Sequence, residues 1–256
     1  MIPSIDQLPA GKKIFFASDF HLGTPSVEAS FEREKKIVRW LDSIKEQAFA
    51  VFLVGDIFDF WFEYKHSIPK GFIRFQGKIA ELTDAGIPVY FFSGNHDMWM
   101  FDYFTKELNV PIFHGPQQFK IGEHQFYVGH GDGLGPKDYT YKLLKILFRS
   151  TICQWLFARI HPNFGIGLAD AWSKKSRITN TAKEDIFLGE KEWLLVYAKE
   201  IQAKQAHHFY VFGHRHLPLD VPVAENSKYI NLGEWVNHYT YAVYDGETLN
   251  LQTFEN

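Results

Sequence analysis

The sequence of 256 residues contains one cysteine, Cys153, which excludes an internal disulfide framework and a zinc site built from cysteines. We therefore expect the protein in a reducing, cytoplasmic compartment, where disulfides are rare. No run of apolar residues reaches the length of about 18 that a transmembrane helix requires. The N-terminal residues 1–13 also lack the apolar core of a secretory signal peptide.

A strong charge of either sign is missing as well. Lys and Arg number 27 and Asp and Glu number 30, so the formal net charge is −3. This balance argues against a protein that binds nucleic acid over its whole surface. Apolar residues make up 46% and charged residues 22%, which is typical of a globular chain and excludes intrinsic disorder. We treat residues 1–256 as a single domain.

Short apolar runs, mostly of β-branched and aromatic residues, predict five buried strands. They are Ile14–Ala17, Val51–Val54, Val89–Phe92, Gln125–Val128 and Phe209–Phe212. Amphipathic stretches at 27–47 and 71–85 predict helices, the first with Ser26 as its N-cap, and a further helix is expected over 181–205. Strands that alternate with helices favour an α/β sandwich. From Lys228 onward the spacing indicates β-hairpins.

Residues 138–177 interrupt this alternation, because their pattern indicates helix and loop instead of a strand followed by a helix. The segment contains seven Lys and Arg residues but only two Asp residues, which gives it a formal charge of +5 and leaves −8 on the rest of the chain. We interpret 138–177 as a helical, lid-like insertion within the domain.

Each predicted strand ends in residues of the types that bind metals. The blocks are Ser18-Asp19-Phe20-His21, Gly55-Asp56, Gly94-Asn95-His96-Asp97, Gly129-His130-Gly131-Asp132 and Gly213-His214-Arg215-His216. In open α/β sheets, sites form outside the carboxyl ends of the strands, so these five ends can converge on one site. Residues two positions apart project to the same face of an extended chain, which lets the Asp-x-His and His-x-His pairs each hold an ion from one side.

The candidate metal ligands are seven: Asp19, His21, Asp56, Asn95, His130, His214 and His216. One ion that must also bind substrate does not need seven protein ligands, whereas two ions that share a bridging carboxylate do. Carboxylate, imidazole and amide donors together suit Mn²⁺, Fe²⁺ or Zn²⁺. The set therefore predicts two divalent ions, an arrangement that clamps a phosphoryl group during in-line displacement.

In order and spacing, these blocks resemble the calcineurin-like metallophosphoesterases over positions 19–216. The resemblance implies a four-layer α-β-β-α sandwich with a dimetal centre at the sheet edge. It also implies how the seven ligands divide between the ions. Asp19, His21 and His216 would hold one ion, Asn95, His130 and His214 the other, and Asp56 would bridge them.

Within this family, the run Leu53–Trp61, the block His130-Gly-Asp132 and the basic, apolar insertion resemble the branch that acts in lipid A synthesis. Enzymes of that branch use manganese at the cytoplasmic face of the inner membrane and hydrolyse UDP-2,3-diacylglucosamine to UMP and 2,3-diacylglucosamine 1-phosphate (lipid X). The resemblance implies a lipid-nucleotide substrate and peripheral contact with anionic membrane, without a nucleic-acid partner. The substrate contacts that it implies are Asn95, His96, Asp138, Ser173, Arg177 and His214.

His96 follows the ligand Asn95, so we expect it to face the same phosphate and to act in catalysis, either as a proton donor or as a positioning hydrogen-bond donor. Asp97 is expected to orient His96 through the second ring nitrogen. Asp132 is expected to orient its neighbours instead of binding metal.

Within the insertion, apolar residues recur near helical spacing, with basic residues along one edge. The apolar residues are Leu144, Leu147, Phe148, Ile152, Trp155 and Leu156, and the basic ones are Lys142, Lys145 and Arg149. Such a helix can lie in a membrane interface or cover acyl chains. Alternatively, it is a cap packed on the core or on a second subunit. For the whole protein, the alternatives are a dimetal phosphoesterase for another nucleotide or phosphoester, and a non-catalytic scaffold.

Overall fold

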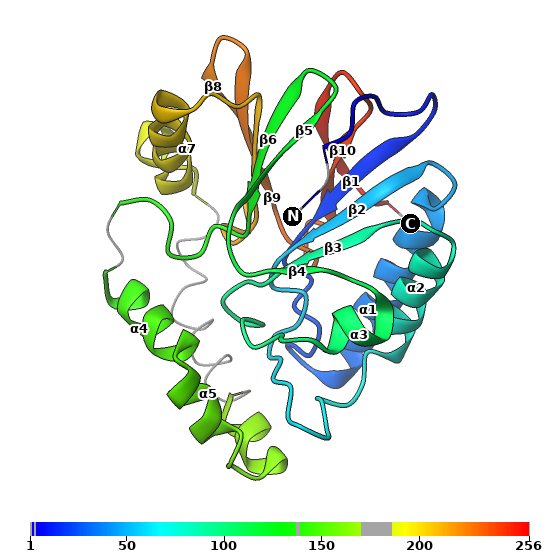
Figure 1. The fold of residues 1–256 in the computed structure, drawn as a ribbon, viewed down its shortest axis with the longest axis vertical. Coiled ribbons are helices and arrows are strands. Elements are labelled where there is room, and N and C mark those ends of the chain that lie inside the picture. The colour runs from blue at the N-terminus through cyan, green and yellow to red at the C-terminus, as the bar shows by residue number, and fades with distance from the viewer. Residues whose placement is uncertain (1, 3, 137–138, 170–185, 256) are drawn as a thin grey trace.

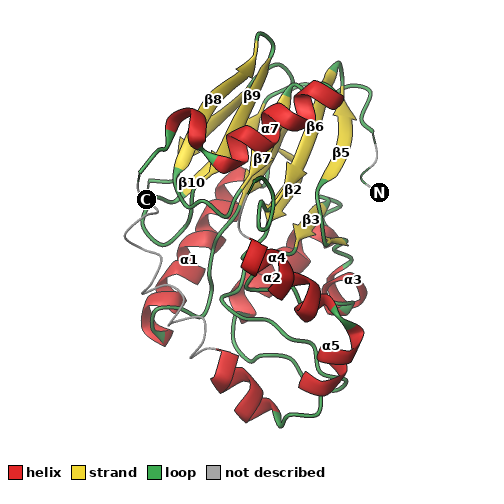
Figure 2. Ribbon diagram, turned by 90° about the vertical axis from the view of Figure 1, so that its left-hand side faces the viewer, coloured by secondary structure: helices red, strands yellow, loops and turns green. Residues whose placement is uncertain are grey.

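Two mixed β-sheets pack face to face in a computed structural model of the protein, which describes residues 2, 4–136, 139–169 and 186–255. Helices cover the outer faces of both sheets (Figures 1 and 2). The first sheet has the order β11-β10-β1-β2-β3-β4, and the second has the order β5-β6-β7-β9-β8.

Parallel pairing brings the site-bearing strands together in each sheet: β1, β2 and β3 are parallel neighbours in the first, and β6 and β7 in the second. The first sheet consists of β1 (Lys13–Ala17), β2 (Ala48–Val54), β3 (Val89–Phe92), β4 (Ile112–Phe113), β10 (Thr240–Tyr244) and β11 (Leu249–Thr253). The second consists of β5 (Gln117–Ile121), β6 (His124–Gly129), β7 (Phe209–Phe212), β8 (Pro218–Ala224) and β9 (Ser227–Leu232). All five predicted strands are confirmed.

The core has three layers of apolar contact, one between the sheets and one under the helices on each outer face. Along β1, Ile14 and Phe16 lie in the cluster between the sheets, while Phe15 and Ala17 lie in the cluster beneath the helices. This division follows from the alternation of side chains in a strand. Helices α1 (Val27–Ile44), α2 (Ile73–Asp84) and α3 (Tyr103–Leu108) cover the first sheet, and α7 (Trp193–Lys204) covers the second. The predicted α-β-β-α sandwich is confirmed.

Two of the predicted helices have the expected positions, and the third begins later than expected. Ser26 caps α1 by accepting a hydrogen bond from the backbone N–H of Ala29 at 3.2 Å, as predicted. The helix predicted over 181–205 begins only at Trp193, after a 3₁₀ turn at Gly189–Lys191. Gly189 has a φ of 57°, a left-handed conformation that an α-helix cannot continue through. Residues 181–185 lie outside the described residues.

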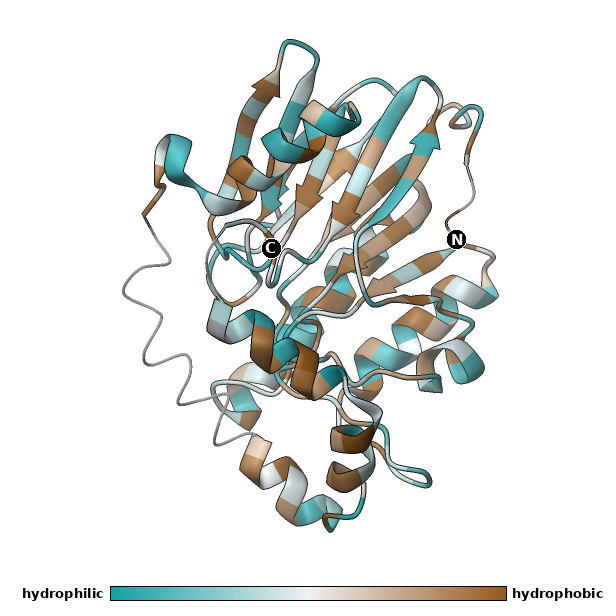
Figure 3. Cartoon of the chain, turned by 60° about the vertical axis from the view of Figure 1, so that its left-hand side comes forward, coloured by the Kyte–Doolittle hydropathy of each residue, from teal (hydrophilic) through white to brown (hydrophobic). Residues whose placement is uncertain are grey.

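The described part of the predicted insertion is mostly helical, with breaks at residue 150 and at residues 158–161. It comprises α4 (Tyr139–Arg149), α5 (Thr151–Phe157) and helical residues 162–169. These helices project from the sandwich at the lower left of Figure 1, and Figure 3 colours many of their residues as hydrophobic. Among the described residues, no helix has both the length and the apolar character needed to span a bilayer.

Candidate metal centre and substrate pocket

The carboxyl ends of β1, β2, β3, β6 and β7 meet at one edge of the sandwich. Backbone hydrogen bonds join the loops within each sheet: the Asp19 N–H donates to the Gly55 carbonyl at 3.0 Å, and the Gly213 N–H donates to the His130 carbonyl at 2.9 Å. Across the sheets, the His214 N–H donates to Asp19 Oδ2 at 3.0 Å. The strand-end blocks predicted to share a site are therefore adjacent.

The candidate ligands form two groups that share one carboxylate, and His21 also lies in a third group with Asp59 and His96. In each group, one ligand atom from every residue lies within 4.8 Å of the others. The first group is Asp19, His21, Asp56 and His216, and the second is Asp56, His130 and His214. Asn95 joins the second group, since its Oδ1 lies 3.2 Å from His130 Nε2. The structure thus brings all seven predicted residues together, with Asp56 common to both groups.

Left-handed backbone is concentrated in these loops. Non-glycine residues with positive φ include Asp19 (55°), His21 (45°), Asp56 (50°), His214 (66°) and His216 (58°). Such conformations cost on the order of 1–3 kcal/mol each and persist where the surrounding contacts impose them. One such contact comes from α1, where the buried guanidinium of Arg33 donates to the His21 carbonyl at 2.7 Å. The strain indicates that the fold aims these side chains at a common point.

Two glycines leave room for the two buried carboxylates. A Cβ at Gly94 would collide with Asp56 Oδ1, and a Cβ at Gly213 would lie 2.5 Å from Asp19 Oδ2. The glycines that precede the ligands therefore admit the carboxylates themselves, in addition to turning the chain.

The electrostatics of the centre favour bound cations. Burial alone would raise the pKa of Asp19, but hydrogen bonds with His21 and His216 hold it below its ordinary value. Burial lowers the pKa of His214 to about 4, so this imidazole is neutral and available as a ligand. Asp19 Oδ1 is the oxygen that faces both histidines, 3.2 Å from His216 Nε2 and 3.6 Å from His21 Nε2. Carboxylates and imidazoles gathered in one buried site are a donor set that suits divalent metal ions.

The structure corrects the role expected for Asp97. Its carboxylate accepts hydrogen bonds from the backbone N–H groups of Ile57 (2.7 Å) and Gly94 (2.7 Å), so it joins the loops after β2 and β3. His96 contacts Asp59 instead, since its Nδ1 lies 3.0 Å from the Asp59 carbonyl oxygen and 3.7 Å from Asp59 Oδ1. Asp59 was not predicted from the sequence, although it stands only three residues after the candidate ligand Asp56.

A pocket of about 340 Å³ extends from the centre to the insertion. Asn95 and His96 line the end near the metal groups, together with Asp59. The rest is mostly apolar, and its residues are Phe60, Trp61, Met98, Trp99, Tyr141, Leu144, Phe148, Phe157, Leu168 and Ala169. Polar anchors at one end and an apolar body at the other are typical of a site for an amphipathic ligand.

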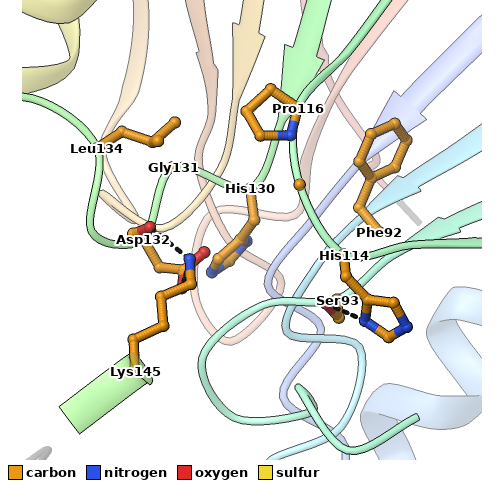
Figure 4. A pocket seen from close by; sticks show the side chains of 10 residues that line it. Phe92, Ser93, His114, Pro116, His130, Gly131, Asp132, Leu134 and Lys145 are labelled. Carbon is orange, nitrogen blue, oxygen red and sulfur yellow. Dashed lines mark hydrogen bonds and ion pairs between the residues drawn. The ribbon is translucent and has the colours of Figure 1, made fainter. Parts of the chain in front are cut away.

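The basic residues of α4, which were predicted to lie along one edge of the helix, contact the core. Lys142 donates to the Gly135 carbonyl at 2.6 Å, and Arg149 donates to the His114 carbonyl. Lys145 reaches Asp132 Oδ2 at 2.5 Å, beside His130 and a second pocket of only about 20 Å³ (Figure 4). Asp132 therefore joins the insertion to the β6 loop, and the orienting role expected of it stays a prediction.

The predicted substrate contacts fall into two sets. Asn95 and His96 line the larger pocket, and His214 belongs to the second ligand group. Asp138, Ser173 and Arg177 lie outside the described residues.

The chain matches one protein-family model and several known proteins. The family model for calcineurin-like phosphoesterases matches residues 12–218. A UDP-2,3-diacylglucosamine hydrolase from Porphyromonas gingivalis is 38% identical, covering 95% of this chain and 98% of its own. A UDP-2,3-diacylglucosamine hydrolase from Vibrio atlanticus is 27% identical, with coverage of 95% and 98%. Among solved structures, Vacuolar Protein Sorting 29 from Cryptosporidium parvum aligns with 96% of this chain and 98% of its own, at 12% identity and a TM-score of 0.45. On the family match and the first of these relatives, the chain belongs to the calcineurin-like phosphoesterase family.

Proposed function

We propose that this protein is a two-metal hydrolase that cleaves the pyrophosphate of UDP-2,3-diacylglucosamine to UMP and 2,3-diacylglucosamine 1-phosphate. The observation that carries the proposal is the pocket of about 340 Å³, which joins the polar ligand groups to an apolar body. A lipid nucleotide has the same division, with charged phosphates at one end and acyl chains at the other. Two relatives that match nearly the whole chain are named for this substrate.

In this proposal Asp19, His21 and His216 hold one divalent ion, Asn95, His130 and His214 hold the other, and Asp56 is shared. Mixed oxygen and nitrogen donors suit Mn²⁺, which we take as the metal. When bound, such a pair of ions orients a phosphoryl group, lowers the pKa of water and neutralises charge during displacement.

His96 is the residue proposed to act on the phosphates. Its Nδ1 is held by the Asp59 carbonyl, so Nε2 is the ring atom assigned to the substrate. From the wall of the pocket, it donates a proton or a charged hydrogen bond to a phosphate oxygen as the bond to the leaving group breaks. Asp59 holds the orientation of the ring, because its backbone carbonyl lies 3.0 Å from Nδ1.

We further propose that the insertion contacts the inner face of the cytoplasmic membrane. Its described helices expose large apolar side chains to solvent. They are Tyr139, Leu143, Ile146, Leu147, Ile152, Trp155, Leu156, Phe164 and Leu168, which we call the insertion surface. An exposed apolar patch of this kind marks a contact surface, and helices with such a face bury it in the interface of a bilayer. Because the basic residues of α4 contact the core, the affinity for the membrane comes mainly from burial of the apolar side chains in the bilayer interface.

A Mn²⁺-dependent assay tests the proposed activity, with UDP-2,3-diacylglucosamine measured beside p-nitrophenyl phosphate esters. We expect release of UMP at a kcat/KM far above that for the aryl esters, and loss of both activities after chelation of metal. Faster hydrolysis of a small phosphoester than of the lipid nucleotide would contradict the assigned substrate and leave the dimetal chemistry in place.

A further inference from the structure

A buried arginine lies between the last two candidate ligands. Arg215 is 2% exposed and follows His214 directly in the chain. Its Nε donates to Glu192 Oε1 at 3.1 Å, and its Nη2 donates to the Ile186 carbonyl at 2.5 Å. The guanidinium also lies 5.1 Å from the centre of the Trp193 ring. Among the described residues, Ile186, Glu192 and Trp193 therefore hold Arg215 from the segment around the start of α7.

Glu192 is the matching buried acid. It is fully buried and directly precedes α7, yet its side chain caps none of the helix's backbone N–H groups. The carboxylate is directed toward Arg215 instead, as the ion pair shows. Burying both charges costs desolvation energy, which their attraction repays only if the two side chains hold a good geometry. The pair therefore constrains the backbone at Glu192 and at Arg215.

The backbone beside this pair is under strain. His214 and His216 have φ values of 66° and 58°, which non-glycine residues adopt only where their surroundings impose it. Within the loop, the Arg215 N–H donates to the Gly213 carbonyl at 2.7 Å, so fixing Arg215 also fixes the turn that both histidines share.

We propose that Glu192 and Arg215 form a positioning pair, which holds the 213–216 loop in its metal-ligating conformation and joins it to the chain returning from the insertion. The proposal rests on the proposed dimetal function. Neither residue is assigned contact with the substrate, so the pair acts through His214 and His216. Partners that orient metal ligands typically contribute about 10- to 100-fold to metal affinity.

The test is Mn²⁺ binding to metal-stripped protein, measured by calorimetry without substrate. Glu192→Gln should weaken binding of at least one ion by about 10-fold or more, since the amide keeps the shape but loses the charge. Glu190→Gln is the matched control, because Glu190 lies two residues away and forms an exposed ion pair with Lys199. This control should bind Mn²⁺ as the wild type does. Melting curves in EDTA identify variants that do not fold.

A second variant keeps the test decisive if Glu192→Gln is unstable. Arg215→Lys retains the charge but cannot hold both Glu192 and the Ile186 carbonyl with the same fork of donors, so it should also weaken binding. When Glu192→Gln and Arg215→Lys are combined, the loss of Mn²⁺ affinity should be smaller than the sum of the two single losses, because both substitutions break the same ion pair.

Unchanged Mn²⁺ affinity in folded Glu192→Gln and Arg215→Lys proteins would overturn the positioning role alone. A wild-type protein without tight Mn²⁺ binding would overturn both this proposal and the dimetal function. A failure to hydrolyse the lipid nucleotide, with the affinity shifts present, would count only against the substrate.

Discussion

Truncation of Phe148 separates the apolar pocket from the chemistry of the metal centre. Phe148 lies on α4, lines the pocket and packs edge-on against Trp99, with ring centroids 5.7 Å apart. The Trp99 Nε1–H donates to the backbone carbonyl of Phe148 at 2.8 Å, a contact that does not depend on the Phe148 side chain. A Phe148→Ala variant should therefore keep α4 in place while it removes a large apolar surface from the pocket.

The expected loss follows from the apolar contact removed. Fully burying a Phe side chain is worth about 1.5–3 kcal/mol, and each 1.4 kcal/mol is about tenfold in an equilibrium or rate ratio. If an acyl chain covers Phe148 in the transition state, kcat/KM for UDP-2,3-diacylglucosamine should fall by about 10- to 100-fold. The hydrolysis of p-nitrophenyl phosphate esters should change by less than about threefold, because a short ester does not reach this surface.

The assay compares initial rates on both substrates in detergent at saturating Mn²⁺. Leu143→Ala is the matched control, since Leu143 lies on the same helix, is 69% exposed and does not line the pocket. It should retain both activities in detergent. Equal losses on both substrates for Phe148→Ala would refute the reasoning and indicate that α4 is a structural cap.

Three further outcomes are expected. Metal analysis of reconstituted protein should give about two ions per chain, and Asp56→Ala should lose both ions and activity, because this carboxylate is shared; a stoichiometry of one would contradict the bridge. His96→Ala should lower kcat by about 100-fold and leave the metal content intact. Asp59→Asn should lower kcat by about 10-fold. A loss of metal from the His96→Ala variant would identify His96 as a metal ligand. The double replacement Leu143→Ser and Ile146→Ser should reduce co-sedimentation with phospholipid vesicles without changing hydrolysis of p-nitrophenyl esters, and unchanged vesicle binding would exclude this surface from the contact.

The sequence by itself determined the layers of the fold and the composition of the candidate metal centre. Short β-branched and aromatic runs predicted the five site-bearing strands, and each was found. The seven candidate ligands could be identified because they stand at strand ends, and parallel strands bring such ends to one edge. These are local patterns, and the geometry of a strand or a helix follows from a few neighbouring residues.

The edges of the sandwich were less predictable. The short strand β4, the strand β5 and the strand β8 were not anticipated. Strand β8 contains two prolines, and its exposed and partly buried residues alternate without a continuous apolar run. Its position at the edge of the sheet explains why prolines are tolerated there.

Only the tertiary structure decided which side chains act on one another. Asp59 contacts His96 and Glu192 pairs with Arg215 because separate strands and helices end at the same place, and no local periodicity records that. The orientation of α4 was also decided by the tertiary structure. A helical pattern shows that basic and apolar side chains lie on different faces, but not which face meets the core. Lys145 lies against Asp132 while Leu143 faces solvent, since the β6 loop offers the carboxylate that the lysine requires.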